Sequence, residues 1–404
     1  MRVWASVGWN RLLVTGLCLV AWRALEQIPV VGLAPSTMFY RLQSADSSTM
    51  VHAIANSVPL AGYSIAVMGV QPYVYALILM TLSGLFSKRV DEIWSSPEGG
   101  LTILRWSRAL TIVLAAVQAD GYTNLWQVDH SLGPMDWSAR LLIVLQLTAG
   151  TMILVLLGDV IDEFGLGFGN GAILIYALTP MATELHRLAG FVDTASSLET
   201  LYRSLAVWIA FSIGVAVATI AVLLAVRRVP QKKTKRATAA APIELRILMS
   251  GILRPPLYAG AILYGPTLAA NYLGASNPQL VQWFNEHLTA YGPNPWTDIG
   301  YAALDACLVI LFAQLVVTLD FRAAPAELAA HIHRLAFIGG TFLAAVVVVV
   351  PILEWNASRI AGRVFGMSGF DVVLIVMLIV IIFDRLEHLV PRVPRTPLLL
   401  SRVP

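Results

Sequence analysis

Few side chains in this sequence have the type and spacing that catalysis or metal binding requires. Cys18 and Cys307 are isolated in apolar stretches, so neither a disulfide framework nor a Cys-based metal site is predicted. His331 and His333 stand two residues apart in a basic turn, where a solvated or lipid-facing role is favoured over metal binding. No nucleophile, acid/base pair or metal cluster recurs along the apolar segments. The sequence therefore predicts no enzyme, no metal site and no cofactor.

A glycine-rich stretch at 165–171 is the remaining candidate for ligand chemistry, as a phosphate-binding loop. A P-loop follows a strand and carries a lysine after its glycines, and neither feature is predicted here. The stretch suits a tight reversal between two helices, with Asn170 capping the second helix. Nucleotide binding is therefore not predicted.

The composition indicates the surroundings in which these residues lie. Of the 404 residues, 57% are hydrophobic and 13% are charged, whereas about 25% of a typical soluble domain is charged. The mean hydropathy is +0.73. A crossing of the bilayer needs about 20 apolar residues, and runs of that kind predict about ten spanning helices. They fall at about 11–33, 66–86, 106–122, 139–160, 171–191, 201–226, 252–273, 299–319, 335–353 and 370–386.

The distribution of lysine and arginine predicts the orientation of these helices. With a cytoplasmic amino terminus, most of the 27 basic residues fall in the inner segments, as the positive-inside rule requires. Both termini are then cytoplasmic. The densest basic segment is 227–236, which could bind anionic lipid or an acidic partner, although topology determination alone would explain several of its charges. Its basic residues are Arg227, Arg228, Lys232, Lys233, Lys235 and Arg236.

The stretch at 49–63 is apolar but too short to cross a bilayer, and Asn56 and Pro59 interrupt it. Backbone that enters the membrane without crossing it survives only when it is buried in protein or lines a wet cavity. A re-entrant half-helix here therefore implies a channel or transporter interior. An amphipathic helix on the outer surface is the other interpretation.

Five ordered stretches of the sequence resemble the SecY family of protein-translocase channel subunits. They are Gly69-Val70-Gln71-Pro72-Tyr73-Val74, the run 105–121, the run 148–163 with Leu157-Gly158-Asp159, Gly167-Phe168-Gly169-Asn170-Gly171, and Arg227-Arg228-Val229-Pro230.

The resemblance implies an all-α polytopic fold in which 1–195 and 196–404 form two pseudo-symmetric inverted halves around a pore. It implies that 49–63 is a plug, with Val51, Ile54, Asn56 and Val58 as its residues. It further implies a mid-membrane ring of apolar side chains that blocks ions by dewetting, although ordinary core packing would also explain each of these residues. Matched motif by motif, the ring consists of Val70, Val74, Ile175, Leu257 and Met377, with Thr179 as a further candidate.

By the same resemblance, the helices at about 66–86 and 252–273 form a lateral gate that releases apolar segments of a passing polypeptide into lipid. Gln71, Thr267 and Asn271 are the candidate polar residues of the gate, although small polar residues in such helices often serve helix packing. The predicted function is passive passage of unfolded, signal-sequence-bearing polypeptides across a bacterial plasma membrane.

The predicted partners follow from the resemblance and from one departure from it. SecE-like and SecG-like subunits and membrane lipid are expected. The family's long basic loop with an Arg-Pro-Gly motif, which serves the ribosome and the SecA motor, is here reduced to 321–334 without that motif. Engagement of a SecA-type motor or a ribosome is therefore in doubt, and no other nucleic-acid contact is predicted.

Two other functions compete with this prediction. An accessory SecY paralogue or an insertase with restricted substrates could keep the gate and plug while losing the motor site. An inverted-repeat secondary transporter would carry ionisable residues at mid-membrane, but the best candidates, Asp305 and Asp384, lie near helix ends.

Overall fold

A computed structural model describes most of the chain. It covers residues 2–32, 63–87, 90, 93, 99–128, 132, 135–194, 197–224, 226–229, 243–246, 255–256, 258–260, 262–263, 295–320, 326–362, 365 and 367–388. The helices are α1 (Arg2–Leu25), α4 (Gln71–Phe86), α6 (Gly99–Val128), α7 (Trp137–Phe164), α8 (Gly171–Thr194), α9 (Leu198–Leu224), α12 (Pro295–Asp320), α13 (Ala326–Ala361) and α14 (Gly369–His388). The strands are β1 (Val226–Val229) and β2 (Ile243–Arg246).

Four of the described helices are long and apolar enough to cross a membrane by length and composition. These stretches are Trp137–Phe164, Leu198–Leu223, Ile299–Thr318 and Leu328–Ala361. Shorter apolar helices lie at Gln71–Met80, Gly171–Met181 and Asp371–Phe383. The helical fold class is confirmed, whereas the total of about ten spans stays a prediction.

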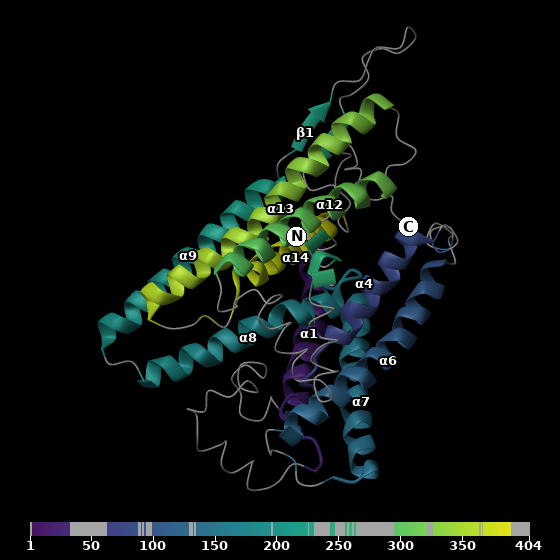
Figure 1. The fold of residues 1–404 in the computed structure, drawn as a ribbon, viewed down its shortest axis with the longest axis vertical. Coiled ribbons are helices and arrows are strands. Elements are labelled where there is room, and N and C mark those ends of the chain that lie inside the picture. Colours follow the sequence, from purple (N-terminus) through teal and green to yellow (C-terminus); the bar gives the residue numbers. More distant parts are fainter. Residues whose placement is uncertain are drawn as a thin grey trace. The chain divides into compact units, whose positions relative to one another are not determined.

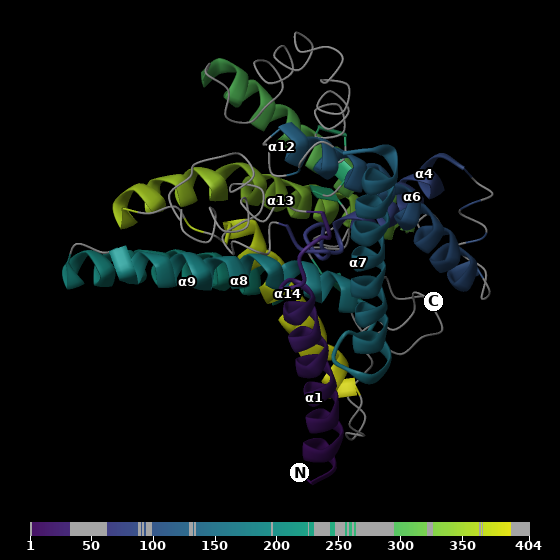
Figure 2. The same cartoon turned by 90° about the horizontal axis from the view of Figure 1, so that it is seen from below.

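The chain divides into two compact units, Met1–Thr194 with Leu378–Pro404, and Ala195–Met377. In the first unit α6 packs against both α4 and α7, and α7 also packs against α1 and α8 (Figures 1 and 2). Helix α7 is therefore the centre of this unit. The arrangement of 1–195 and 196–404 as inverted halves stays a prediction.

The sequence of α7 explains its central place. Asp136 caps its amino terminus by accepting a hydrogen bond of 2.9 Å from the Ala139 backbone N–H, as N-cap residues do. Its buried residues recur every three or four positions, which is the spacing of one helix face. They are Ile143, Leu147, Gly150, Thr151, Leu154, Val155, Gly158 and Ile161.

In the second unit α13 packs against α12 and α9 (Figure 1). The first residue of α14, Gly369, packs closely against α13 and α9. A Cβ added at Gly369 would lie 1.8 Å from a methyl carbon of Val350 and 3.1 Å from the Phe211 ring, so a larger residue does not fit there. The strands β1 and β2 pair antiparallel, with Arg228 opposite Glu244. The sequence did not predict this pairing, since alternation over four residues is too short a signal.

Candidate functional site

Helix α4 begins at a sharp turn that the residue types require. Gly69 has a φ of +57°, a value that glycine adopts at little cost. Val70 is the N-cap residue, and Pro72 lies in the first turn of the helix. A backbone N–H at that position would have no partner within the helix, so proline is tolerated there. The turn fixes where Val70 and the residues of α4 lie.

Two of the predicted ring residues lie in one apolar cluster. Val70 is 1% exposed and Ile175 is 0% exposed, and they pack in the same buried cluster. The other buried members of the cluster are Cys18, Trp22, Ala66, Leu154 and Ile161. The side chain at position 175 therefore reaches from α8 into the cluster that contains the start of α4.

Among the described ring candidates, Val74 and Thr179 do not belong to that cluster. Val74 is buried one turn along α4, and its N–H donates to the Val70 carbonyl at 3.1 Å. Met377 is buried in α14 and belongs to the second unit. Thr179 is exposed, and its hydroxyl donates to the Ile175 carbonyl at 3.0 Å within α8. Leu257 lies outside the described residues.

Of the predicted gate residues, Gln71 alone lies in the described part of the chain. It is half-buried in the first turn of α4, and its Nε2 donates a hydrogen bond of 2.7 Å to the Tyr75 hydroxyl. Thr267 and Asn271 lie outside the described residues, as do the predicted plug residues Val51, Ile54, Asn56 and Val58.

The segments on either side of residues 33–62 pair with each other. Val30 N–H donates to the Tyr63 carbonyl at 2.8 Å, and Ile65 N–H donates to the Ile28 carbonyl at 3.0 Å. Gln146 of α7 joins this pairing, because its Oε1 accepts a hydrogen bond of 3.0 Å from Val31 N–H. We name residues 28–31 with 63–65 the bracket. Sequence reasoning missed it, since no alternating pattern marks so short a pairing.

Helix α7 passes directly against the bracket. A Cβ added at Gly150 would lie 1.9 Å from the Ile65 carbonyl oxygen, so no larger residue fits there without a backbone shift. The ring of Tyr63 lies 5.4 Å from that of Trp126 in α6, measured between centroids. The bracket is therefore held by both α6 and α7.

The glycine-rich turn between α7 and α8 is organised by Asp162. The Asp162 carboxylate accepts hydrogen bonds from Gly169 N–H at 2.8 Å and Gly171 N–H at 2.7 Å. Asn170 lies at the N-cap position of α8, because its backbone carbonyl accepts a hydrogen bond of 2.7 Å from Leu174 N–H, while its side chain donates a 3.5 Å bond to the Phe168 carbonyl. Asp162 lies near the end of α7, and its carboxylate accepts from both the Gly169 and Gly171 backbone N–H groups, which would otherwise lack a partner at the start of α8.

Helix α1 fastens the same turn. The Arg11 guanidinium donates to the Gly165 carbonyl at 2.9 Å and lies 5.2 Å from the centre of the Phe168 ring. Leu166 N–H donates to the Thr15 hydroxyl at 2.9 Å. Because these contacts join residues about 150 positions apart, the sequence alone could not reveal them.

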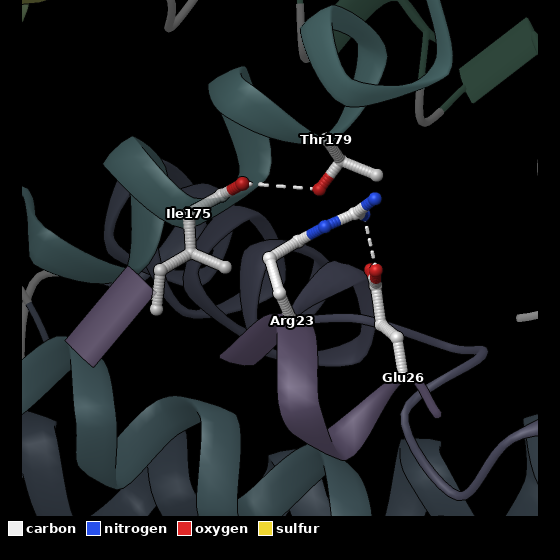
Figure 3. A network of polar contacts seen from close by, with 4 residues as sticks. All are labelled: Arg23, Glu26, Ile175 and Thr179. Carbon is white, nitrogen blue, oxygen red and sulfur yellow. Dashed lines mark hydrogen bonds and ion pairs between the residues drawn. The ribbon is translucent and has the colours of Figure 1, made fainter. Parts of the chain in front are cut away.

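Two ion pairs join α6 to α7. Arg108 contacts Asp159 at 2.6 Å, and Arg140 contacts Asp120 at 2.5 Å. The helices run antiparallel, so the pairs lie at opposite ends of the interface. A third pair, Arg23 with Glu26, lies at the end of α1 near Ile175 and Thr179 (Figure 3). All three ion pairs could have been suspected from the sequence, because each joins oppositely charged residues that lie within long apolar stretches.

The predicted partner surface is described only in part. Arg227 and Arg228 lie in β1, whereas Lys232, Lys233, Lys235 and Arg236 lie outside the described residues. Within the described residues, no group of three or more His, Cys, Asp or Glu side chains could hold a metal ion. His333 Nδ1 lies 3.2 Å from the Gln314 side-chain oxygen, which links α13 to α12.

Comparisons with known proteins agree with one another. A family model described as SecY matches residues 64–327. The chain is 24% identical over 352 residues to a protein translocase subunit SecY of Streptomyces scabiei, covering 80% of this chain and 76% of the relative. A solved structure described as a protein conducting channel superposes with a TM-score of 0.63 at 16% identity, covering 94% of this chain and 92% of that one. Sec61 in a canine ribosome–channel complex from the endoplasmic reticulum gives a TM-score of 0.60, also at 16% identity.

Proposed function

Because this chain belongs to the SecY family, we propose that it is the channel-forming subunit of a protein translocase, which passes unfolded polypeptides across a membrane. Its relative in Streptomyces scabiei is named as such a subunit. The solved channel with which it superposes shares its multi-pass helical fold. Family membership also implies a passive conduit in which an external driving force moves the polypeptide, rather than an enzyme.

The observation that supports this function best is the burial of Val70 and Ile175 in one apolar cluster. An apolar constriction excludes ions by dewetting, yet it gives way to a chain that fills it. The cluster joins the start of α4 to α8. We propose that these two residues, together with Val74, Leu257 and Met377, form the ring.

Lateral release into lipid follows from the same proposal. The helix α4 and the segment 252–273 would be the two sides of the gate, with Gln71, Thr267 and Asn271 as its polar residues. The short hydrogen bond between Gln71 and Tyr75 lies within α4, so α4 can move without breaking it. Residues 49–63 would serve as the plug.

The partners are proposed on the same ground. SecE-like and SecG-like subunits would bind the channel in a bacterial plasma membrane, with both chain termini in the cytoplasm. Helix α12 ends at Asp320 and α13 begins at Ala326, so five residues connect the two helices. We propose that a motor or ribosome contact at this loop is reduced and that the basic segment 227–236 carries the contact with the driving partner.

A site-specific crosslink tests the proposed function. Val70→Cys is introduced in a Cys18→Ala, Cys307→Ala background, because Cys18 lies in the same cluster as Val70. The variant is combined in membranes with a stalled secretory precursor that carries a photoreactive or thiol-reactive residue. A crosslink that requires the precursor's signal sequence is expected.

The matched control is Leu79→Cys, on the same helix but 44% exposed in the structure. It should crosslink to lipid probes and not to the precursor. No crosslink at Val70, while an ordinary SecY in the same membranes captures the precursor, would exclude general export. A restricted set of substrates or an insertase role would then account for the chain.

A further inference from the structure

The end of α1 carries an ion pair next to the proposed ring. Arg23 and Glu26 pair three residues apart, and the guanidinium also lies over the Trp22 ring at 5.5 Å. The Glu26 side chain is 10% exposed, whereas the Arg23 side chain is 40% exposed. The carboxylate is thus enclosed by protein while the cation keeps an open side.

The pair lies beside Trp22, which shares a buried cluster with Ile175 of α8. This cluster joins the end of α1 to α8. Figure 3 shows the Arg23 side chain extending toward the turn of α8 that carries Ile175 and Thr179. Thr179 follows Ile175 by one helical turn in the direction away from the Gly165–Gly171 reversal.

Distances along the two helices give the depth of the pair. Arg11 bonds to Gly165 at the reversal, and Arg23 lies twelve residues further along α1, which is about 18 Å at 1.5 Å per residue. Thr179 lies eight residues beyond Gly171 in α8, which is about 12 Å. The centre of the hydrocarbon layer is about 15 Å from either surface. With the reversal at the cytoplasmic surface, the pair lies near the middle of the membrane.

A cation at this depth is strongly disfavoured in contact with lipid. Ionisable side chains within a membrane almost always face the protein interior or a water-filled cavity, and they mark transport paths. Contact with water is therefore the expected reason for the exposed side of Arg23. If the ion pair served only to hold α1 against α8, the Arg23 side chain would not need to be exposed.

We propose that Arg23 and Glu26 border the aqueous path on the outward side of the apolar ring and set the charge preference of the open channel. The inference rests on the proposed channel function. The intact pair has no net charge, so a chain or ion that passes it meets neither a strong attraction nor a strong repulsion. Low-dielectric walls intensify the effect of any single charge in such a path, and removal of either partner should therefore make the channel selective.

The test is the ion selectivity of opened channels. Purified full-length protein, with any subunits that copurify, is reconstituted in planar bilayers across a KCl gradient and opened with a synthetic signal peptide. Relative to wild type, Arg23→Gln should raise the permeability ratio of K⁺ to Cl⁻ about threefold or more, the scale expected of one unit charge beside a narrow aqueous path. Glu26→Gln should lower the ratio by a similar factor.

Three controls separate charge from structure. Arg23→Lys keeps the cation and should leave the ratio unchanged. The exchanged pair, Arg23→Glu with Glu26→Arg, should also resemble wild type, and it tests the proposal if a single variant does not fold. Arg140→Gln removes the cation of another ion pair, with Asp120, and should not alter the ratio.

The outcomes distinguish this inference from the function on which it rests. Signal-peptide currents in wild type with equal ratios in all variants would overturn the charge-selective role and leave the channel intact. Absence of any peptide-dependent current in wild type would overturn the proposed function itself. Opposite shifts for the two single variants, with the exchanged pair near wild type, support the inference.

Discussion

Val70 contributes to the proposed ring through its position, because valine has no special chemistry. It is the N-cap residue of α4, and Pro72 and Gly69 fix the geometry of that helix start. Gly69 and Pro72 could be recognised in the sequence, because they belong to the motif at 69–74. The predicted ring residue Ile175 lies 105 residues further along the chain and was assigned by its place after the glycine-rich turn. The structure adds that Ile175 is buried in the same cluster as Val70.

Substitution of Val70 by serine should make the closed channel leak ions. A hydroxyl at the constriction retains water, so the free-energy barrier that dewetting imposes on ions falls. Ion flux from KCl-loaded liposomes should rise severalfold over wild type. Leu79→Ser on the exposed face of α4 is the control, and equal leak from both variants would contradict the ring assignment.

Gly167→Ala should destabilise the turn between α7 and α8. An added Cβ would lie 2.2 Å from the Asp162 carboxylate oxygen, so the carboxylate must move away from Gly169 and Gly171. Overpacking of this kind costs about 1–3 kcal/mol, and the midpoint of thermal unfolding in detergent should fall. Gly214→Ala, at which an added Cβ would contact nothing within 4 Å, should not lower the midpoint, because alanine favours a helix more than glycine does. A Gly167→Ala midpoint equal to that of wild type would show that the turn is free to rearrange.

At the scale of elements, helices were predictable and their contacts were not. Apolar runs at 139–160 and 171–191 correspond to α7 and α8, because length and hydropathy are local properties. The bracket and the two ion pairs between α6 and α7 depend on residues that come together only when separate segments pack. The pattern of apolar residues along a helix does not determine which other helix packs against it.

The two ion pairs between α6 and α7 should show their role in an exchange experiment. Arg108→Gln leaves Asp159 without its cation, and a loss of about 1 kcal/mol in the free energy of unfolding is expected for a pair that is one-third exposed. The exchanged pair, Arg108→Asp with Asp159→Arg, should recover most of that loss. Unfolding in graded denaturant measures both, and failure of the exchange to recover stability would assign the loss to packing.

At the scale of the whole molecule, the fold class followed from composition, whereas the division of the chain did not. The expected boundary at 195–196 came from a family resemblance, and the arrangement as inverted halves stays a prediction. Spans that insert independently can assemble from separate chains. We therefore predict that 1–195 and 196–404, expressed together as two polypeptides, copurify and support precursor crosslinking at Val70.

The matched control for this split is expression of either fragment alone, which should be degraded or should aggregate. Copurification through an affinity tag on one fragment, measured in mild detergent, decides the outcome. Recovery of the tagged fragment without its partner would mean that the connection near 195–196 is needed for assembly.

The three ion pairs also bear on how the chain enters the membrane during synthesis. Arg23 and Glu26 lie three residues apart at the end of α1 and just beyond it, so this pair can form as soon as that end of the helix has formed. Helix α6 cannot pair its charges in this way, since Arg108 and Asp120 find their counter-ions on α7. Unpaired charges at membrane depth oppose insertion, so α6 should linger at the insertion site until α7 emerges. The two helices would then enter the bilayer together, as a hairpin whose charges are already matched.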